Sequence, residues 1–283
     1  MGADPSDLGG IVLVDKPAGM SSFAATAAVR RGLGVRKAGH AGTLDPFATG
    51  LLIVLVGRAR RIQRFFMAMP KTYEAVARLG AVSTTGDPEG EITVTGVLPP
   101  DPPDLPTGVI RQRPPAYSAV HVDGVRAYER ARRGEDVQVP EREVTVYAFE
   151  QRGREGDRAA FHVACSSGTY IRSLIADLGD AYTEELRRTS IGPFDVQDAD
   201  PERIVPLGEV LGFLRSVELD AGAAGLIAHG RPVPAPAVIS EPAPPWRLPQ
   251  TPPEILVRDA LGPVALAEHL EDGLLKPVVG FRG

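Results

Sequence analysis

Apolar and polar residues alternate along several short stretches of the chain, and this alternation predicts strands. Residues 71–79 (KTYEAVARL) put Tyr73 on one face and Glu74 on the other, and a period of two is typical of a half-buried strand. Residues 51–56 (LLIVLV) are apolar throughout, as expected of a strand that is buried on both faces. The turn residues 87–90 (DPEG) follow the alternating stretch, so this region is predicted to form a hairpin.

Capping residues and helical spacing predict two helices. The first begins at Ser21 or Ser22 and runs to about Gly34, because serine is a preferred N-cap and glycine a common stop. It follows a short strand (GIVLV) and a loop with proline and glycine. The second helix covers residues 171–178, where apolar residues recur at helical intervals after a strand at 158–165 and a turn.

The order of these elements favours an α/β (α+β) fold. Strands and helices alternate without a regular strand–helix–strand rhythm, which favours a mixed sheet over a doubly wound parallel one. Residues 99–106 (PPDPPDLP) cannot hold a regular element. Toward the C-terminus the composition changes, with nine prolines within residues 232–253. We therefore expect a large domain at 9–220 and a small, mostly β domain at 221–283.

The bulk composition is that of a globular protein without a membrane segment. Hydrophobic residues make up 43% and charged residues 24% of the chain, which is typical of a soluble domain. The longest strongly apolar run, at residues 51–56, is far too short to cross a membrane, and the acidic start (MGADPSDLGG) does not resemble a signal peptide. Because Cys165 is the only cysteine, no internal disulfide can form, and a cytoplasmic location is expected.

Charge is distributed unevenly along the chain. The net charge is −5, yet residues 30–64 hold eight basic residues against one acid, and residues 195–283 hold thirteen acids against seven bases. A local field depends on where charges lie rather than on their sum. The basic block, which begins at Arg30 and Arg31, could therefore meet a polyanion such as a nucleic acid. The alternative is an ordinary solvated basic surface.

The loop before the apolar strand holds a single acid, Asp45, in the sequence AGHAGTLDPFATG. Pro46 restricts the backbone of Asp45, and Gly39 and Gly42 allow a ligand to approach the chain closely. A carboxylate held in this way can serve as a nucleophile or a general base. The alternative is an aspartate that only caps a turn, which is the common role of aspartate before proline.

Arg172 stands at the start of the second predicted helix. The positive end of the helix dipole makes arginine mildly unfavourable there. A guanidinium in this place could hold a carboxylate from another loop ionised and oriented; a surface arginine is the alternative. Tyr73 and Tyr170 could stack on a nucleic-acid base, or they could be ordinary core tyrosines.

Patterns for metal, nucleotide and serine-hydrolase chemistry do not occur. The five histidines lack paired spacing and there is no second cysteine, so no zinc site is expected. The chain has neither the phosphate-binding pattern GxxxxGK[ST] nor the nucleophile elbow GxSxG. Neither a metal nor a cofactor is therefore expected.

Seven segments, in order between residues 9 and 194, resemble the bacterial tRNA pseudouridine-55 synthases, the pseudouridine synthase B family. They are LVDKPAGMSS, AGHAGTLDPFATGLL, KTYEAVARLG, TTGDPEG, RPPAYSAVHVDGVRAYERAR, CSSGTYIRSLIADLG and LRRTSIGPF. Any one of them would be weak evidence, whereas all of them in the family's order make a highly specific match.

The resemblance implies the pseudouridine synthase fold, with a mixed, largely antiparallel central sheet and flanking helices, followed by a small PUA-like RNA-binding domain. It implies that one uridine in the T loop of tRNA, at position 55, is flipped out and isomerised to pseudouridine without cofactor or metal. The T arm of tRNA would be the partner. No membrane and no obligate protein partner are expected, and the expected state is a monomer.

The same resemblance assigns roles to individual residues. Asp45 would be the catalytic aspartate, Arg172 its ionic partner, and Tyr73 the ring that stacks on the base and assists proton removal at C5. Tyr170 and Leu186 would line the uracil pocket. The expected substrate-binding residues are His40, Asp87, Tyr170, Leu186, Lys16, Arg30 and Arg31.

The chain departs from the family pattern in ways that bear on RNA binding. The segment 93–110 is short and rich in proline, and the segment 180–186 is shortened. Altered or weaker binding of tRNA is therefore expected. From the sequence alone, three alternatives stay open: a non-catalytic RNA-binding protein on the same scaffold, a hydrolase with an aspartate nucleophile, and a synthase directed by a guide RNA or to mRNA. Whether an adduct forms at the base or the reaction proceeds through elimination at the sugar is also open.

Overall fold

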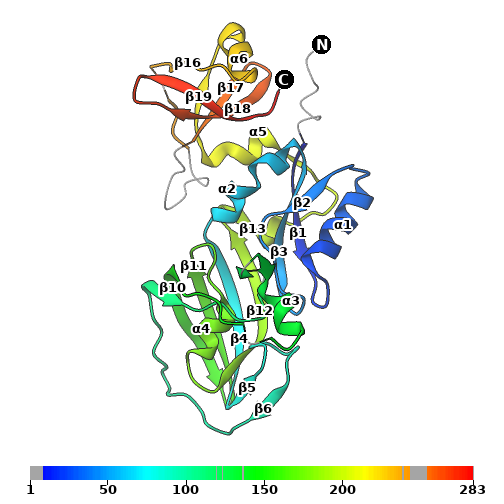
Figure 1. Cartoon of the computed structure of the whole chain (residues 1–283), viewed down its shortest axis with the longest axis vertical. Coiled ribbons are helices and arrows are strands. Elements are labelled where there is room, and N and C mark those ends of the chain that lie inside the picture. The colour runs from blue at the N-terminus through cyan, green and yellow to red at the C-terminus, as the bar shows by residue number, and fades with distance from the viewer. Residues whose placement is uncertain are drawn as a thin grey trace.

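The computed structural model describes residues 9–118, 120–122, 124–135, 137–237, 239–242 and 254–282. Within these ranges, ten strands form one large sheet (Figure 1). They are β1 (Gly9–Lys16), β2 (Ala38–His40), β3 (Thr49–Gly57), β4 (Lys71–Leu79), β7 (Gly108–Gln112), β10 (Arg142–Glu155), β11 (Arg158–Cys165), β12 (Ala181–Ile191), β13 (Phe194–Asp195) and β14 (Val205–Pro206). Their order is β14-β1-β3-β12-β4-β11-β10-β7, with β2 beside β3 and β13 beside β12.

The large sheet is antiparallel except where β12 pairs with β3, so the predicted mixed, largely antiparallel sheet is confirmed. The predicted hairpin at 71–98 is wrong in its pairing. Both edges of β4 are taken by β11 and β12, and only β5 (Ala81–Ser83) and β6 (Ile92–Val94) pair around the turn at 87–90. The long hairpin of this sheet is β10–β11.

Helices and 3-10 turns cover both faces of the large sheet, whereas α6 packs against the C-terminal sheet. Among the described residues the helices are α1 (Ser22–Gly32), α2 (Gln63–Ala68), α3 (Ala127–Arg132), α4 (Ile171–Ala176), α5 (Leu207–Val210) and α6 (Ala221–Ala228). The 3-10 turns are η2 (Arg58–Ile62), η3 (Val196–Asp198) and η4 (Leu211–Phe213), and β8 (His121–Val122) pairs with β9 (Val125–Arg126). The start of α1 follows the sequence expectation, because Ser21 accepts a hydrogen bond from the Ala24 N–H at 3.1 Å.

The apolar run at 51–56 is buried on both faces because alternate residues of β3 enter two cores. Leu52 and Val54 pack under α1. Leu51 and Ile53 face the opposite side, where α2, α5 and η4 cover the sheet. A third cluster lies between α4 and the β4–β11 part of the sheet. This third core includes Leu44, Tyr73 and Ile171, so it holds the segments on which Asp45 and Arg172 lie.

A second sheet lies at one end of the molecule, beyond α5 and α2 (Figure 1). It consists of β15 (Arg215–Glu218), β17 (Ile255–Asp259), β18 (Gly262–His269), β19 (Leu274–Gly280) and β16 (Val233–Pro234), in that order. The small, mostly β C-terminal unit is thus present. β15 pairs with β17, so this sheet includes residues before 221, and the domain boundary at that residue stays a prediction. The proline-rich residues 243–253 lie outside the described residues.

The two sheets share a hydrophobic core. Leu256, Leu266 and Phe281 of the second sheet and its C-terminal end pack in the same cluster as Phe66 of α2 and Phe213 of η4. The apolar contact fixes the small sheet against the end of the large one.

Candidate active site

A cavity of about 730 Å³ opens where the large sheet, the start of α1 and the start of α4 meet. Its wall includes most of the residues expected in the site, namely Asp45, Tyr73, Arg172, His40, Asp87, Tyr170 and Leu186. These residues come from segments that are far apart in the sequence. The topology of the sheet brings them together, because β4 lies between β12 and β11 and the β2–β3 loop reaches the same face.

The Asp45 loop is held from both sides. Ser22 Oγ accepts a hydrogen bond from the Leu44 N–H at 2.8 Å and donates one to the Leu44 carbonyl at 3.0 Å. The Pro46 carbonyl accepts a hydrogen bond from Lys16 Nζ at 3.2 Å. The carboxylate of Asp45 keeps 32% of its side-chain surface exposed, so a rigid backbone presents it to the cavity.

Arg172 lies at the N-terminal end of α4 with only 3% of its side chain exposed. Its Nε is 3.0 Å from Asp45 Oδ2, and its Nη1 is 2.8 Å from Asp87 Oδ2. The guanidinium also donates to the carbonyls of Thr85 and Tyr117, each at 2.8 Å. Such a planar fork, which is a property of arginine and not of lysine, fixes the position of the Asp45 carboxylate.

Asp87 is the second carboxylate that pairs with Arg172. It lines the cavity, but Arg172 pairs with one of its carboxylate oxygens, and the Glu89 N–H donates to the other at 3.0 Å. The Thr85 hydroxyl donates to that second oxygen as well. We therefore assign Asp87 the positioning of Arg172, and its expected contact with substrate stays a prediction.

The charges around Asp45 shape its acidity. Burial raises the pKa of the Asp45 carboxyl, and the Arg172 guanidinium opposes this effect. The nearby Asp87 carboxylate raises the pKa further, while Lys16 and Arg188 lower it. The net direction is upward, which makes the ionised Asp45 a stronger base and nucleophile than a free aspartate.

Arg188 of β12 lines the cavity beside Tyr73, the residue opposite it on β4. This fully buried guanidinium donates to the Leu51 carbonyl at 2.8 Å and to the Gly42 carbonyl at 3.2 Å. Its backbone lies so close to β3 that a Cβ on Gly50 would be 2.2 Å from the Arg188 carbonyl oxygen, which only glycine permits. Burial raises the pKa of the Tyr73 phenol, and a hydrogen bond from Arg188 works in the opposite direction, so the phenol is protonated near neutral pH.

Lys71 is a second buried cation in the cavity wall. Its Nζ donates to the carbonyls of Met67, at 2.8 Å, and Met69. Burial, with repulsion from Arg188, lowers the pKa of Lys71 to about 7. A lysine of this acidity is partly neutral at physiological pH, which limits the positive charge beside Tyr73.

Neither Arg188 nor Lys71 was among the expected site residues, although the sequence carries a signal for both. Lys71 precedes Tyr73 by two residues and Arg188 follows Leu186 by two. In a strand this spacing places both members of a pair on one face. In a predicted strand, a residue two positions before or after an assigned site residue is therefore itself a candidate for the site.

The remaining cavity residues are positioned by local contacts. Gln112 holds Tyr170 by accepting from its N–H at 2.8 Å and donating to its carbonyl at 3.0 Å. The Arg142 guanidinium lies 5.0 Å from the centre of the Tyr170 ring, within the range of a cation–π contact. The His40 carbonyl accepts a hydrogen bond from Gln63 Nε2 at 2.7 Å. The rings of Tyr73 and Tyr170 are among those that line the same cavity.

Lys16 is buried beneath the Asp45 loop. Its side chain is fully buried, and Nζ donates to the carbonyls of Pro17 and Met20, each at 2.8 Å, and to that of Pro46. An ammonium has three protons to donate, so these acceptors use all of them. We assign Lys16 a positioning role in the Asp45 loop, and its expected contact with substrate stays a prediction.

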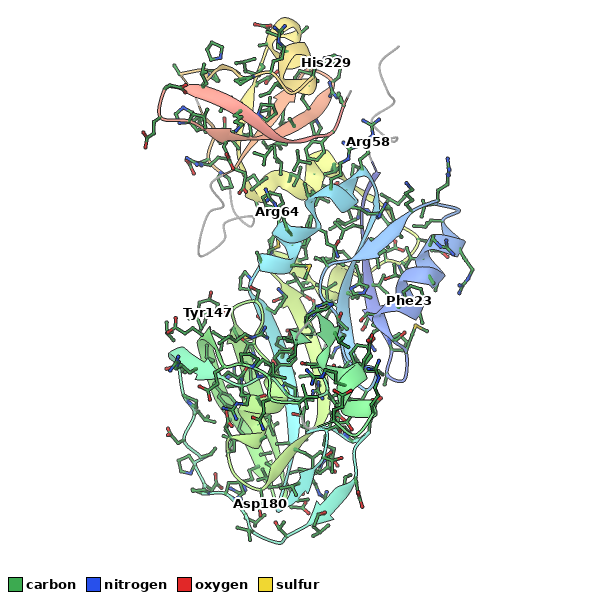
Figure 2. All side chains as sticks on the ribbon, in the orientation of Figure 1. Phe23, Arg58, Arg64, Tyr147, Asp180 and His229 are labelled. Atoms are coloured by element: carbon green, nitrogen blue, oxygen red, sulfur yellow. The ribbon has the colours of Figure 1, made fainter. Side chains whose placement is uncertain are left out.

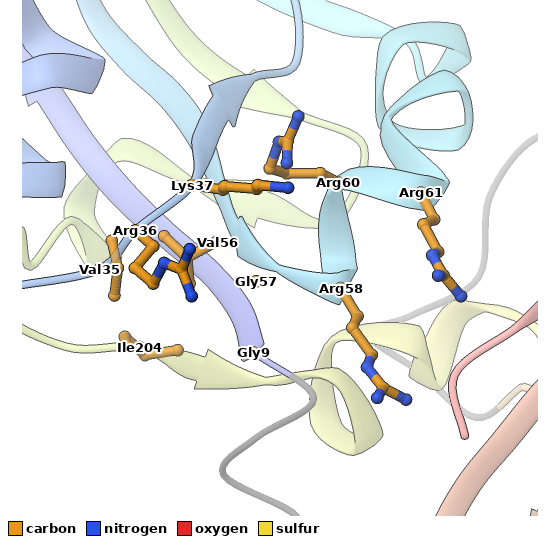
Figure 3. A pocket seen from close by; sticks show the side chains of 10 residues that line it. All are labelled: Gly9, Val35, Arg36, Lys37, Val56, Gly57, Arg58, Arg60, Arg61 and Ile204. Carbon is orange, nitrogen blue, oxygen red and sulfur yellow. The ribbon is translucent and has the colours of Figure 1, made fainter. Parts of the chain in front are cut away.

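Arg30 and Arg31 are exposed in the last turn of α1 and do not line the cavity. Five other cations of the basic block gather around a separate hollow of about 680 Å³ (Figure 3). They are Arg36, Lys37, Arg58, Arg60 and Arg61. No acidic side chain belongs to this hollow within the described part of the chain, so we call it the basic hollow.

Two of these arginines also connect the two sheets. Arg58 donates to the Phe281 carbonyl, and Arg61 donates to the Gly280 carbonyl at 2.8 Å. The basic hollow therefore lies beside the junction of the sheets, where Figure 2 labels Arg58.

Over the described ranges, no three histidine, cysteine, aspartate or glutamate side chains are grouped so that they could hold a metal ion. In the same ranges, no helix has the length and apolar character needed to cross a membrane.

Comparison with protein families and sequences gives consistent matches. The family model described as "TruB family pseudouridylate synthase (N terminal domain)" matches residues 30–171. A protein of Thermobifida fusca named tRNA pseudouridine synthase B is 42% identical, over 97% of this chain and 99% of that protein. A protein of the same name from Aromatoleum aromaticum is 41% identical, over 80% of this chain and 82% of that protein.

Two solved structures have a similar fold. A Cbf5–Nop10–Gar1 complex contains a chain that matches with a TM-score of 0.71 and 24% identity, over 98% of this chain and 86% of that one. A chain of an H/ACA ribonucleoprotein bound to a substrate RNA containing 2′-deoxyuridine matches with a TM-score of 0.69 and 23% identity, over 100% of this chain and 90% of that one. At these identities the likeness concerns the fold alone.

Proposed function

The chain belongs to the TruB family of pseudouridylate synthases, and we propose that it isomerises the uridine at position 55 in the T loop of tRNA to pseudouridine. It is an enzyme that converts uridine to pseudouridine in tRNA. The observation that carries the finer proposal is the Asp45 carboxylate, which lies 3.0 Å from the buried Arg172 guanidinium and is still accessible from the cavity.

The reaction rearranges one nucleotide without a change in composition. The glycosidic bond from N1 to C1′ breaks, a bond from C5 to C1′ forms, the C5 proton leaves to solvent, and N1 gains a proton. No electrons are gained or lost, so Asp45 can start the reaction without an oxidant or reductant. It either adds to the uracil ring or promotes elimination at the sugar, and both routes need its ionised carboxylate.

The target base must leave the folded loop to reach Asp45. Flipping a base out of a stack costs about a few kcal/mol. The cavity can offset part of that cost, because the rings of Tyr73 and Tyr170 and the side chain of Leu186 line it. We assign the stacking contact to Tyr73, which positions the uracil ring so that the C5 proton can leave to solvent after the new carbon–carbon bond has formed.

Phosphate contacts supply the rest of the binding energy in this proposal. The basic hollow gathers cations outside the cavity, and Arg30 and Arg31 are exposed on α1. Contacts of this kind fix the position of an RNA without reading its sequence. We further infer that the enzyme works in the cytoplasm as a monomer, without an obligate protein partner.

Release of tritium from C5 of uridine tests the proposal. A T-arm stem-loop RNA with tritium at C5 of its uridines is incubated with the protein. We expect one tritium to be released per RNA, because the C5 proton of the converted uridine is lost to solvent. The matched control is the same RNA with cytidine at position 55, from which no tritium should be released. Failure to release tritium at enzyme-equivalent concentrations contradicts the proposal.

The basic hollow makes a prediction about salt. In the triple variant Arg36→Gln, Lys37→Gln and Arg60→Gln, the affinity for tRNA should fall and depend less steeply on salt. The slope of log K against log salt should decrease by about 1 for each cation that contacts a phosphate. Dissociation constants measured between about 50 and 200 mM salt give this slope.

Controls separate the basic hollow from charge in general. Arg152→Gln removes an exposed charge on β10 that pairs with Glu150, and it should leave the slope unchanged. The pair Arg30→Gln and Arg31→Gln tests whether the RNA extends over α1. An unchanged slope in the triple variant excludes the basic hollow from the RNA-binding surface.

A further inference from the structure

We propose that Phe23 is a stacking platform for a base that flanks the target uridine, and hence a substrate-positioning residue. This inference rests on the proposed function. Phe23 lies in the first turn of α1 with 79% of its surface exposed, and it belongs to the wall of the cavity that holds Asp45 (Figure 2). Single exposed apolar residues are common on proteins, so the argument depends on where this ring lies and how it is held.

The backbone of Phe23 is coupled to the Asp45 loop. The preceding residue, Ser22, is buried and forms two hydrogen bonds with Leu44, which is adjacent to Asp45. On the other side, the Ser21 cap accepts a hydrogen bond from the Ala24 N–H at 3.1 Å. An exposed aromatic ring therefore stands on a rigid turn that is hydrogen-bonded to the catalytic loop.

The chemistry of this rim suits a nucleobase. Met67, which is 47% exposed, belongs to the same cavity wall, as does His40. Rigid aromatic side chains bind unstacked bases by their faces, and this contact tolerates any base. When the target uracil enters the cavity beside Asp45, the adjoining nucleotides must cross the rim. A flanking base then meets the ring of Phe23, which replaces the stacking that the base loses.

The buried residues of the cavity wall provide no surface for the bases that flank the target uridine. Tyr73 and Leu186 are largely buried in the cavity wall, so they can hold the target base but not its neighbours. Among the described phenylalanine and tyrosine residues of this wall, Phe23 is the exposed one, and the tyrosines are buried or partly buried. The Phe23 ring is thus available for a second base while the first occupies the cavity.

The test combines three variants with three RNAs. Phe23→Ala, Phe23→Leu and Phe23→Tyr are compared on a T-arm stem-loop and on two copies with an abasic site directly 5′ or 3′ of the target uridine. Both KM and kcat from tritium release and Kd from direct binding are measured. With the intact RNA, Phe23→Ala should raise KM and Kd about 10-fold or more and change kcat little. Phe23→Tyr should be close to the unmodified protein, and Phe23→Leu should lie between.

The abasic RNAs identify the stacked base. On one of them the unmodified protein should lose the same factor in Kd, and Phe23→Ala should cause no additional loss, because the interaction is already absent. A matched control is Tyr147→Ala, which removes an exposed ring on β10 outside the cavity and should change nothing. Thermal unfolding of each variant checks that it is folded.

The outcomes are distinct from those of the proposed function. The stacking inference is overturned if Phe23→Ala binds all three RNAs as the unmodified protein does, or if its affinity for all three falls by the same factor. The first of these results would assign the Phe23 ring to a contact with another macromolecule. If the unmodified protein binds RNA but releases no tritium, the proposed function fails. The Kd comparison still decides the role of Phe23 in that case.

Discussion

Replacing Asp45 with asparagine should abolish turnover while leaving the fold and the affinity for tRNA intact. Asparagine has nearly the shape of aspartate but cannot be ionised, so it can act neither as a nucleophile nor as a base. Loss of an essential nucleophile lowers kcat by factors on the order of 10⁴ to 10⁶. Tritium release under single-turnover conditions measures this loss, and retention of turnover would exclude Asp45 as the catalytic residue.

The fold of this variant should be preserved because other residues hold the loop. Ser22 and Lys16 bind the backbone on either side of Asp45, and Arg172 keeps Asp87 as its ionic partner. Burial raises the pKa of Asp45, so keeping it ionised in the folded protein costs stability above the pKa of an unfolded aspartate. The asparagine variant should therefore be as stable as the unmodified protein or slightly more stable.

Two comparisons complete this test. Urea unfolding of Asp45→Asn should give a free energy of unfolding no lower than that of the unmodified protein. Glu150→Gln, which neutralises an exposed acid on β10, should change neither turnover nor stability. A variant that is unfolded, or that loses tRNA binding together with turnover, would indicate a structural role for Asp45 instead.

Local patterns in the sequence predicted the elements whose form depends on neighbouring residues. The apolar run at 51–56 became β3, and the serine cap placed the start of α1. The same patterns could not predict which strands pair. β4 lies between β11 and β12, and these partners come about eighty residues or more later in the chain, at 158–165 and 181–191. The hairpin at 71–98 was wrong for this reason.

The sequence predicted a site residue where an adjacent residue restricts its backbone. It could not predict the contacts that the fold makes between side chains distant in the sequence. Pro46 and the glycines marked Asp45, but its contact with Arg172 spans 127 positions and was expected only from the family resemblance. The contact of Asp87 with substrate was also expected from the family resemblance, and nothing local in the sequence shows that Asp87 pairs with Arg172. The burial of Lys16 likewise depends on carbonyls that the sequence does not reveal as neighbours.

Replacing Arg172 with alanine should destabilise the protein and inactivate it together. The change leaves the carboxylates of Asp45 and Asp87 without the cation between them, and the carbonyls of Thr85 and Tyr117 without a donor. Removing one partner of a buried ion pair typically costs about 3–5 kcal/mol. Urea unfolding should show a loss of this size, and tritium release should fall to nearly the level of Asp45→Asn.

Arg187→Ala is the matched control for stability. Arg187 pairs with Asp15, but both side chains are about 40% exposed or more, and exposed pairs contribute about 0–1 kcal/mol. Arg172→Lys should be only a partial replacement, because a single ammonium cannot reach two carboxylates and two carbonyls at once.

A double variant separates the structural role of Arg172 from its catalytic one. In Arg172→Ala with Asp87→Asn, one of the two orphaned carboxylates is neutral, so part of the lost free energy of unfolding should return. Turnover should not return, because Asp45 still lacks the guanidinium that orients it and favours its ionised form. Recovery of turnover together with stability would mean that Arg172 acts only by keeping the protein folded, and that Asp45 needs no cation to react.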